Sequence, residues 1–179
     1  LQGDLSHHRI VQFVKESGVW FVLDVMEADR PRTYRQQWWM SKLTEKNPDG
    51  YMEEWVSADA DKGMFYSHAD SMANVSMYHV GPVLLETGTR QTRNYNPVST
   101  YIKQEEWYKG FRADRKQGVE FLHLTTDWHS EAGRSQLITV IYPRRQGQSE
   151  EDLQVERTDN GREVTVTTNS GDRIHFVAD

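Results

Sequence analysis

The sequence predicts an all-β protein: a multi-stranded antiparallel β-sandwich of the supersandwich kind. Short runs of β-branched and aromatic residues recur along the 179-residue chain, and turn sequences such as Asn-Pro-Asp-Gly at 47–50 separate them. No segment keeps a 3.6-residue apolar period between helix caps, and the best helical candidate, 105–115, is interrupted by Gly110. Aromatic residues make up 11% of the chain, so a core can form although only 36% of the residues are hydrophobic.

The sequence of residues 8–26 predicts a β-hairpin. Residues 8–14 read HRIVQFV, a turn through Gly18 follows, and residues 19–26 read VWFVLDVM. The second run is nearly continuously apolar, which is typical of a strand buried on both faces. Asp24 is its polar interruption, and a buried carboxylate is costly unless it is paired. We therefore expect a structural partner for Asp24, either Arg9 on the neighbouring strand or the N–H groups of a turn, rather than a catalytic role.

The rest of the sequence predicts further strands, so that the whole sandwich has about twelve. They are expected at 33–40, 52–56, 64–67, 75–79, 83–86, 100–103, 118–126, 136–142, 153–157, 163–168 and 173–177. The last two form the clearest hairpin, because alternating EVTVTT meets RIHFV across an Asn-Ser-Gly-Asp turn. The polar segment 88–97 reads as a long loop of the kind that is often functional. We expect one domain over residues 1–179, with a possible minor seam at 144–152.

Charge and composition exclude several classes of function. The net charge of −6 argues against a nucleic-acid or anionic-membrane partner, because binding phosphates requires a clustered excess of Lys and Arg. An acidic polysaccharide remains a possible ligand, since a local basic surface can exist on an acidic protein. The chain has no cysteine, which excludes disulfides and thiolate metal sites. No signal peptide is visible, and no run approaches the roughly 20 apolar residues that span a bilayer.

Three stretches resemble the later part of the β-sandwich in heparinase II/III-like polysaccharide lyases. The first runs from His8-Arg9-Ile10-Val11 through the apolar strand that ends at Asp24. The second is TYRQQW at 33–38, and the third is LITVIYP at 137–143. They occur in the family's order and cover nearly the whole chain.

The resemblance implies a C-terminal domain of a larger, exported bacterial enzyme, periplasmic or secreted. Such lyases carry an N-terminal (α/α) toroid and cleave uronic-acid polysaccharides by β-elimination. Their catalytic Tyr and Asn or His lie largely in the toroid, and a further His and the metal ligands lie in a His-rich stretch near the start of the sandwich. We expect this chain to begin after that stretch, because Ser67-His68-Ala69-Asp70 falls in the wrong place to match it. The chain alone is therefore predicted to be inactive, with no catalytic residues and no cofactor.

The candidate substrate-binding residues are Tyr34, Arg35, Trp38, Trp39, Arg90 and Arg93. On a strand, Tyr34 and Trp38 share one face while Arg35 and Trp39 share the other. Aromatic rings stack on sugar faces and Arg binds uronate or sulfate through two hydrogen bonds, so this cluster suits an acidic polysaccharide. The competing interpretation is that one face is core and the other is an interface with the toroid.

Metal binding is not expected. His7 and His8 are adjacent and point to opposite faces of a strand. His68 and Asp70 would need His79 or His123 to form a site, and no spacing brings them together.

Two other functions stay open: a stand-alone carbohydrate-binding β-sandwich and a structural sandwich unrelated to sugars. Solvent-facing rings near Arg side chains would favour carbohydrate binding, whereas an apolar patch without a cleft would favour a domain interface.

Overall fold

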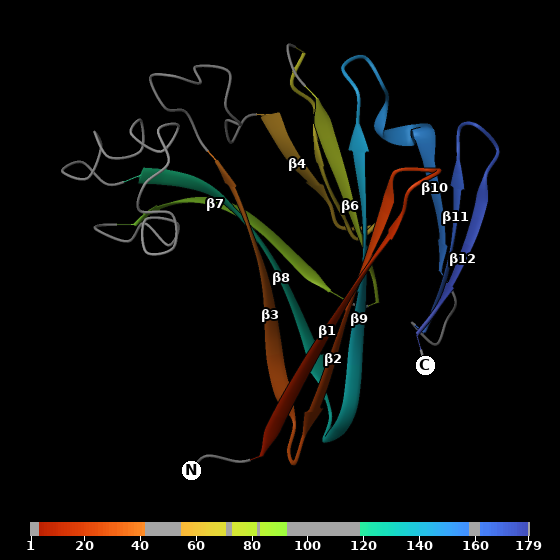
Figure 1. Cartoon of the computed structure of the whole chain (residues 1–179). Coiled ribbons are helices and arrows are strands. Elements are labelled where there is room, and N and C mark those ends of the chain that lie inside the picture. Colours follow the sequence, from red (N-terminus) through yellow and green to blue (C-terminus); the bar gives the residue numbers. More distant parts are fainter. Residues whose placement is uncertain are drawn as a thin grey trace, which may run out of the picture.

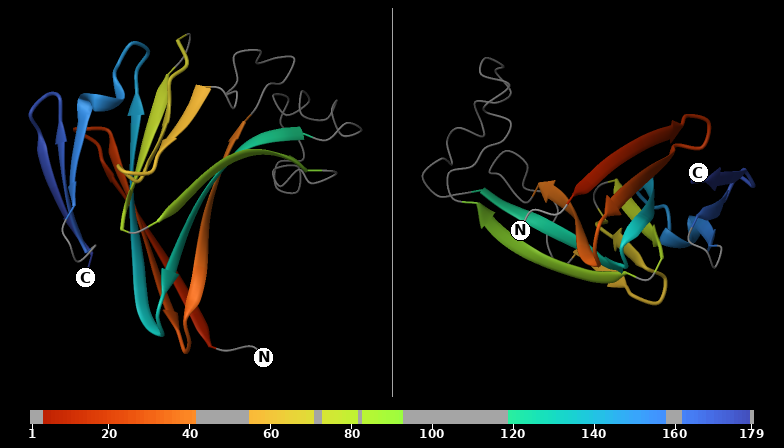
Figure 2. Two further views of the ribbon diagram at one scale, coloured as in Figure 1. Left: turned by 180° about the vertical axis from the view of Figure 1, so that it is seen from behind. Right: turned by 90° about the horizontal axis from the view of Figure 1, so that it is seen from below.

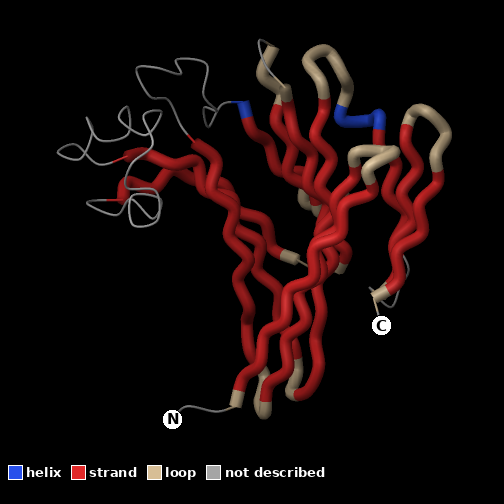
Figure 3. Tube along the Cα trace, viewed as in Figure 1, coloured by secondary structure: helices blue, strands red, loops and turns tan. Residues whose placement is uncertain are grey.

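The computed structural model describes residues 4–41, 55–70, 73–81, 83–92, 119–157 and 162–178 (Figures 1 and 3). These residues form strands, and the short 3₁₀ helix η4 (Glu150–Asp152) precedes β10, which confirms the all-β prediction. The strands are β1 (Leu5–Val14), β2 (Val19–Ala28), β3 (Arg32–Ser41), β4 (Val56–Asp59), β5 (Met64–Ser67), β6 (Asn74–Val80), β7 (Leu84–Thr92), β8 (Val119–Ser130), β9 (Gly133–Arg144), β10 (Leu153–Arg157), β11 (Glu163–Thr168) and β12 (Arg173–Val177). The strand predicted at 100–103 and the helical candidate at 105–115 lie outside the described residues.

The strands form three antiparallel sheets. The largest has six strands in the order β1-β2-β9-β6-β5-β4, and the other two have the orders β3-β8-β7 and β10-β11-β12. Both predicted hairpins are present, with Arg9 opposite Asp24 in the first and Val166 opposite Ile174 in the second. β9 lies between β2 and β6, so this late strand joins two early parts of the chain.

The six-stranded sheet is the middle layer, with a three-stranded sheet packed on each of its faces (Figure 2). Side-chain alternation along the strands creates both cores. Phe21, Ile138 and Val140 point toward the β10-β11-β12 sheet and join its Val164 in one buried cluster. On the opposite face, Phe65 and Met77 pack with Leu124 of β8, and Leu137 packs with Tyr34 and Trp128.

Burial on both faces explains the apolar sequence of β2. Phe21, Val22, Leu23 and Asp24 are all at most 3% exposed, as expected for a strand covered from two sides. Within the described ranges, no helix is long and apolar enough to cross a membrane.

Gly63, in the turn before β5, has a conformation and a packing that only glycine satisfies. Its φ is +60°, and a Cβ atom there would lie 3.0 Å from both the His79 carbonyl oxygen and a nitrogen of the Arg157 guanidinium. Gly18, in the β1–β2 turn, has a similar φ of +72° but open space around it.

This pair of glycines gives a matched test of close packing. Gly18→Ala is expected to lower the free energy of unfolding by about 1 kcal/mol, the cost of a left-handed alanine. Gly63→Ala should cost at least about 1 kcal/mol more, because the added methyl group also displaces a backbone carbonyl and a guanidinium. Urea unfolding of both variants measures the difference, and equal losses would mean that the Arg157 contact imposes no constraint.

Candidate functional site

A cluster of polar side chains surrounds Asp24, between the six-stranded sheet and β3. Arg9 donates from Nε and an Nη to the two carboxylate oxygens at 2.7 and 2.9 Å, and His7 Nε2 lies 2.8 Å from Oδ1. Gln36 Nε2 donates to the same carboxylate at 2.8 Å. The pairing follows from register, because Arg9 is directly opposite Asp24 and shares its face. The predicted Arg9 partnership is confirmed.

These contacts keep Asp24 charged although it is only 1% exposed. Burial by itself would raise the pKa of this carboxyl, but the hydrogen bonds from Arg9, His7 and Gln36 outweigh burial and hold the pKa below its ordinary value. The hydrogen bond to Asp24 in turn raises the pKa of Arg9. Because both carboxylate oxygens are bound by side chains at a site that is 1% exposed, the geometry gives Asp24 a structural role.

Gln36 links the two sheets through both ends of its amide. Its Oε1 accepts hydrogen bonds from Trp38 Nε1 at 2.9 Å and from Thr139 Oγ1 at 3.1 Å, while its Nε2 reaches Asp24. The Arg9 guanidinium lies 5.9 Å from the ring centre of Trp38. The half-buried Trp38 is thus oriented by the buried network and packs against the cluster of Val56, Phe65, Met77 and Leu124.

The structure separates the predicted substrate-binding residues of β3 by face, as the alternation predicts. Tyr34 is 5% exposed and packs on Trp128 with ring centres 5.3 Å apart. Arg35 is on the opposite face, 51% exposed, and forms a bidentate pair with Asp127 of β8 at 2.7 and 2.6 Å. Its guanidinium therefore already binds a carboxylate.

Three of the predicted residues cannot be placed as side chains. Trp39 lies opposite His123 and Arg90 lies opposite Phe121 in the strand register, but their side chains fall outside the described residues, as does Arg93 altogether. Saccharide binding by the six candidates stays a prediction.

His79 on β6 is a buried histidine for which the sequence predicted no structural role. It is fully buried between the layers, with Nε2 3.0 Å from Thr126 Oγ1 and Nδ1 3.3 Å from the Gly63 carbonyl oxygen. Burial lowers its pKa to about 4, so the imidazole is neutral near pH 7. His68, by contrast, is exposed and lies 3.2 Å from Ser57 Oγ. Among the described side chains no group of three or more metal-binding residues comes together.

The lowered pKa of His79 predicts a pH-dependent stability. The unfolded chain takes up a proton at its ordinary pKa of 6.5 and the folded chain only near 4, so stability is lost as the pH falls through this window. The His79 contribution to the free energy of unfolding should decline by up to about 1.4 kcal/mol per pH unit. NMR titration is the direct measurement: the His79 ring signals should stay constant from pH 7.5 to 5, whereas a normal titration would contradict the burial.

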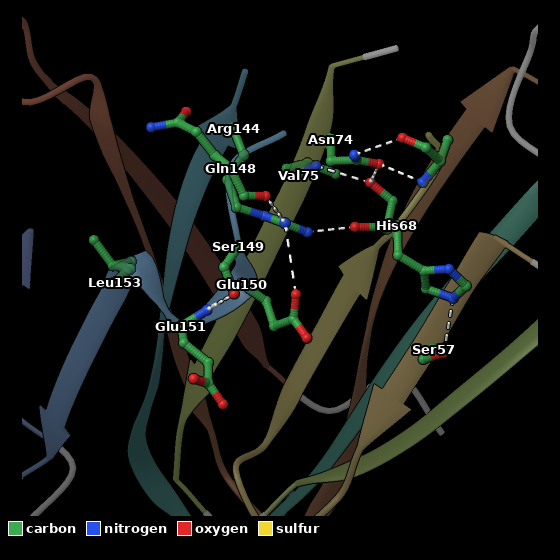
Figure 4. Close-up of polar contacts among 12 residues, drawn as sticks. Ser57, His68, Asn74, Val75, Arg144, Gln148, Ser149, Glu150, Glu151 and Leu153 are labelled. Atoms are coloured by element: carbon green, nitrogen blue, oxygen red, sulfur yellow. Dashed lines mark hydrogen bonds and ion pairs between the residues drawn. The ribbon is translucent and has the colours of Figure 1, made fainter. Parts of the chain in front are cut away.

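A second polar cluster joins the ends of β5, β6 and β9 (Figure 4). Arg144 is 2% exposed and donates to the carbonyl oxygens of Ser67 and Gln148, with Glu150 3.8 Å away. Asn74 binds the backbone of Ala69 through both ends of its amide, at 2.8 and 2.9 Å. The Arg144 bonds attach the connection between β9 and η4, within the predicted seam, to the end of β5, and the Asn74 bonds hold the β5–β6 connection.

An open cavity of about 710 Å³ lies beside that connection, between the β4–β5 turn and β10. Met64, Leu153 and Val155 supply apolar walls, and charged residues including Glu150 and Arg157 surround them. The Tyr78 hydroxyl donates to the carbonyl oxygens of Glu150 and Leu153, and burial raises its pKa to about 12. Sequence reasoning did not find this cavity, because its residues come from three separate segments, 61–64, Tyr78 and 150–157.

Comparisons with known proteins agree with the fold. No family model matches the chain, and no curated protein does. A crystal structure of a mutant heparan sulfate lyase HepC from Pedobacter heparinus matches with a TM-score of 0.64 and 13% identity over 97% of this chain. A heparinase III structure matches with a TM-score of 0.63 and 16% identity over 96%. The chain spans about a quarter of these lyases, 24% and 23% of their lengths.

At 13% and 16% identity the matches establish the architecture of the chain. They confirm the resemblance to heparinase-type lyases that the three sequence stretches predicted. The chain has the β-sandwich fold of the matched region of heparinase III-type lyases.

Proposed function

We propose that this chain is the non-catalytic C-terminal β-sandwich of a polysaccharide lyase that cleaves uronic-acid polysaccharides by β-elimination. In this role it packs on an N-terminal (α/α) toroid and helps to shape the substrate cleft. The observation that carries the proposal is the structural match, which covers 97% of this chain but only 24% of a heparan sulfate lyase. By analogy with exported lyases of this fold, the proposal places the enzyme in the bacterial periplasm or outside the cell.

Three buried ionisable groups, Asp24, Tyr78 and His79, are unsuited to lyase chemistry. β-Elimination requires a base whose pKa lies near the working pH, within reach of the sugar. Tyr78 is shifted to about 12 and is engaged in two hydrogen bonds, while His79 is shifted to about 4 and fully buried. Asp24 is buried and held by three side chains.

An exposed apolar strand supports a domain interface. Val11 and Phe13 of β1 and Trp20 of β2 share one face of the hairpin and are 54%, 46% and 38% exposed. The rings of Phe13 and Trp20 stack with their centres 4.3 Å apart. These side chains do not line the 710 Å³ cavity. An apolar patch of this kind is the feature that distinguishes an interface from a sugar platform.

The isolated chain is expected to leave uronic-acid polysaccharides uncleaved. The assay incubates it with heparin, heparan sulfate and alginate, and follows the ultraviolet absorbance of the unsaturated uronate that β-elimination creates. An active heparinase is the positive control. Product formation by this chain, abolished by one point substitution within it, would contradict the proposal.

A second candidate is a stand-alone carbohydrate-binding sandwich. The observation that favours it is the half-buried Trp38 ring beside the 43% exposed Arg9, an aromatic surface next to a cation. Affinity electrophoresis at low salt tests this role with an acidic glycan in the gel. Retardation that Trp38→Ala abolishes would support it, whereas unchanged mobility would exclude it.

A further inference from the structure

Arg157, the last residue of β10, has a half-buried side chain that lies between two sheets. It is opposite Val164, so it shares the inner face of the β10-β11-β12 sheet with Leu153 and Val155. Its guanidinium reaches the six-stranded sheet, where a Cβ atom on Gly63 would lie 3.0 Å from one of its nitrogens. Among the described side chains, no hydrogen bond and no ion pair engages this guanidinium.

Two acidic groups near Arg157 have other partners. Asp59 accepts a hydrogen bond from the Lys62 backbone N–H at 2.9 Å and lies 3.7 Å from the Lys62 ammonium. Glu150 lies 3.8 Å from the guanidinium of Arg144 (Figure 4). The donors of Arg157 therefore stay available to a ligand.

The surroundings of Arg157 make its charge costly. Burial lowers the pKa of Arg157, and the charges of Asp59 and Tyr78 offset that effect only in part. An unpaired charge that is partly removed from water lowers the stability of a fold. A charge of this kind at the wall of a cavity is therefore a candidate for ligand binding.

Arg157 lines the open cavity of about 710 Å³ between the β4–β5 turn and β10, a volume typical of small-molecule sites. We propose that this cavity binds a small aliphatic monocarboxylate, whose two oxygens accept hydrogen bonds from the Arg157 guanidinium. The planar guanidinium matches a carboxylate in this two-bond geometry. The carbon chain of the ligand lies against the aliphatic side chains of Met64, Leu153 and Val155.

The charge of the lining limits the ligand to a single negative charge. Two basic side chains and three acidic ones line the cavity, which gives a net charge of −1: Lys62 and Arg157, and Asp61, Glu150 and Glu151. One carboxylate beside the guanidinium is favourable in this setting, whereas a dianion such as phosphate or a polyanionic glycan is repelled.

The aromatic residue of the lining favours an aliphatic acid over a sugar acid. Tyr78 is only 6% exposed, and its hydroxyl donates to two backbone carbonyl oxygens. It therefore offers no open ring face on which a sugar could stack. The site is independent of the proposed lyase role, so the failure of either leaves the other standing.

NMR titration of the whole chain with hexanoate tests the site. The amide signals of Gly63 and Val155 and the Nε–H signal of Arg157 should shift together, with a dissociation constant on the order of 1 mM. Arg157→Met should raise this constant at least about tenfold. Arg157→Lys keeps the charge without the two-bond geometry and should give an intermediate value. The matched control is Arg173→Met, at a 69% exposed arginine on the outer face of the same sheet, which should bind hexanoate as the unmodified chain does.

Two further probes separate the charge of the ligand from its carbon chain. Glucuronate has the charge without the aliphatic chain, and hexanol has the chain without the charge, so both should bind at least about tenfold more weakly than hexanoate. Arg157→Met should also keep or raise the thermal midpoint, because it removes an unpaired charge from a half-buried position. The absence of shifts with hexanoate, unchanged affinity in Arg157→Met, equal binding of glucuronate, or a lower midpoint in Arg157→Met would overturn the proposal.

Discussion

Asp24→Ala is expected to lower the free energy of unfolding by about 3 kcal/mol. The substitution leaves Gln36 Nε2 without its acceptor between two sheets and removes the ion pair with Arg9. Urea unfolding followed by tryptophan fluorescence measures the loss. The matched control is Asp127→Ala, which breaks a bidentate pair of similar geometry with the 51% exposed Arg35. That surface pair should contribute about 1 kcal/mol or less. Equal losses in the two variants would show that Asp24 does not link the sheets.

The Asp24 effect should also depend on pH. Its pKa is lower in the folded chain than the ordinary 3.8, so its contribution is complete above pH 3.8 and is lost as the pH falls through the folded pKa. The difference in stability between the unmodified chain and Asp24→Ala should therefore be constant from pH 7 to 5 and shrink below pH 4. A difference that shrinks between pH 7 and 5 would contradict an ionised, buried carboxylate.

Arg144→Met is expected to cost about 3 kcal/mol, because it leaves the carbonyl oxygens of Ser67 and Gln148 without their donor. The neighbouring Arg145 is exposed, so Arg145→Met is a matched control with an expected change within about 0.5 kcal/mol. Hydrogen exchange adds a local readout. Amides of η4 and the start of β10 should lose protection in Arg144→Met before those of β2 do, and a uniform loss would mean that Arg144 does not hold this connection.

Sequence patterns predicted the local parts of the fold. The first and last hairpins are each formed by contiguous residues, and the structure confirms both predictions. Turns at Gly18 and at 169–172 join the paired strands. The cost of burying Asp24 led to Arg9, because a neighbouring strand of a hairpin is the nearest source of a cation.

The parts that sequence reasoning missed depend on distant pairing. The placement of β9 between β2 and β6, and the separation of β3 into another sheet, have no local signature. The role of Gln36 was missed for the same reason: its partners Asp24 and Thr139 meet only when two sheets pack. His79 reads as an ordinary strand residue until Thr126 and Gly63 are brought beside it.

The measurement that tests the central claim most directly is thermal unfolding of this chain with heparin, heparan sulfate, alginate and a neutral glucan. A ligand at about a hundred times its dissociation constant stabilises the folded state by roughly 2.7 kcal/mol, which a shift in midpoint reveals. If the chain is a scaffold and its parent enzyme binds substrate through another domain, we expect no shift of the unfolding midpoint with any glycan. Selective stabilisation by one uronate polymer, weakening with salt, would contradict that account and make this sandwich a binding domain in its own right.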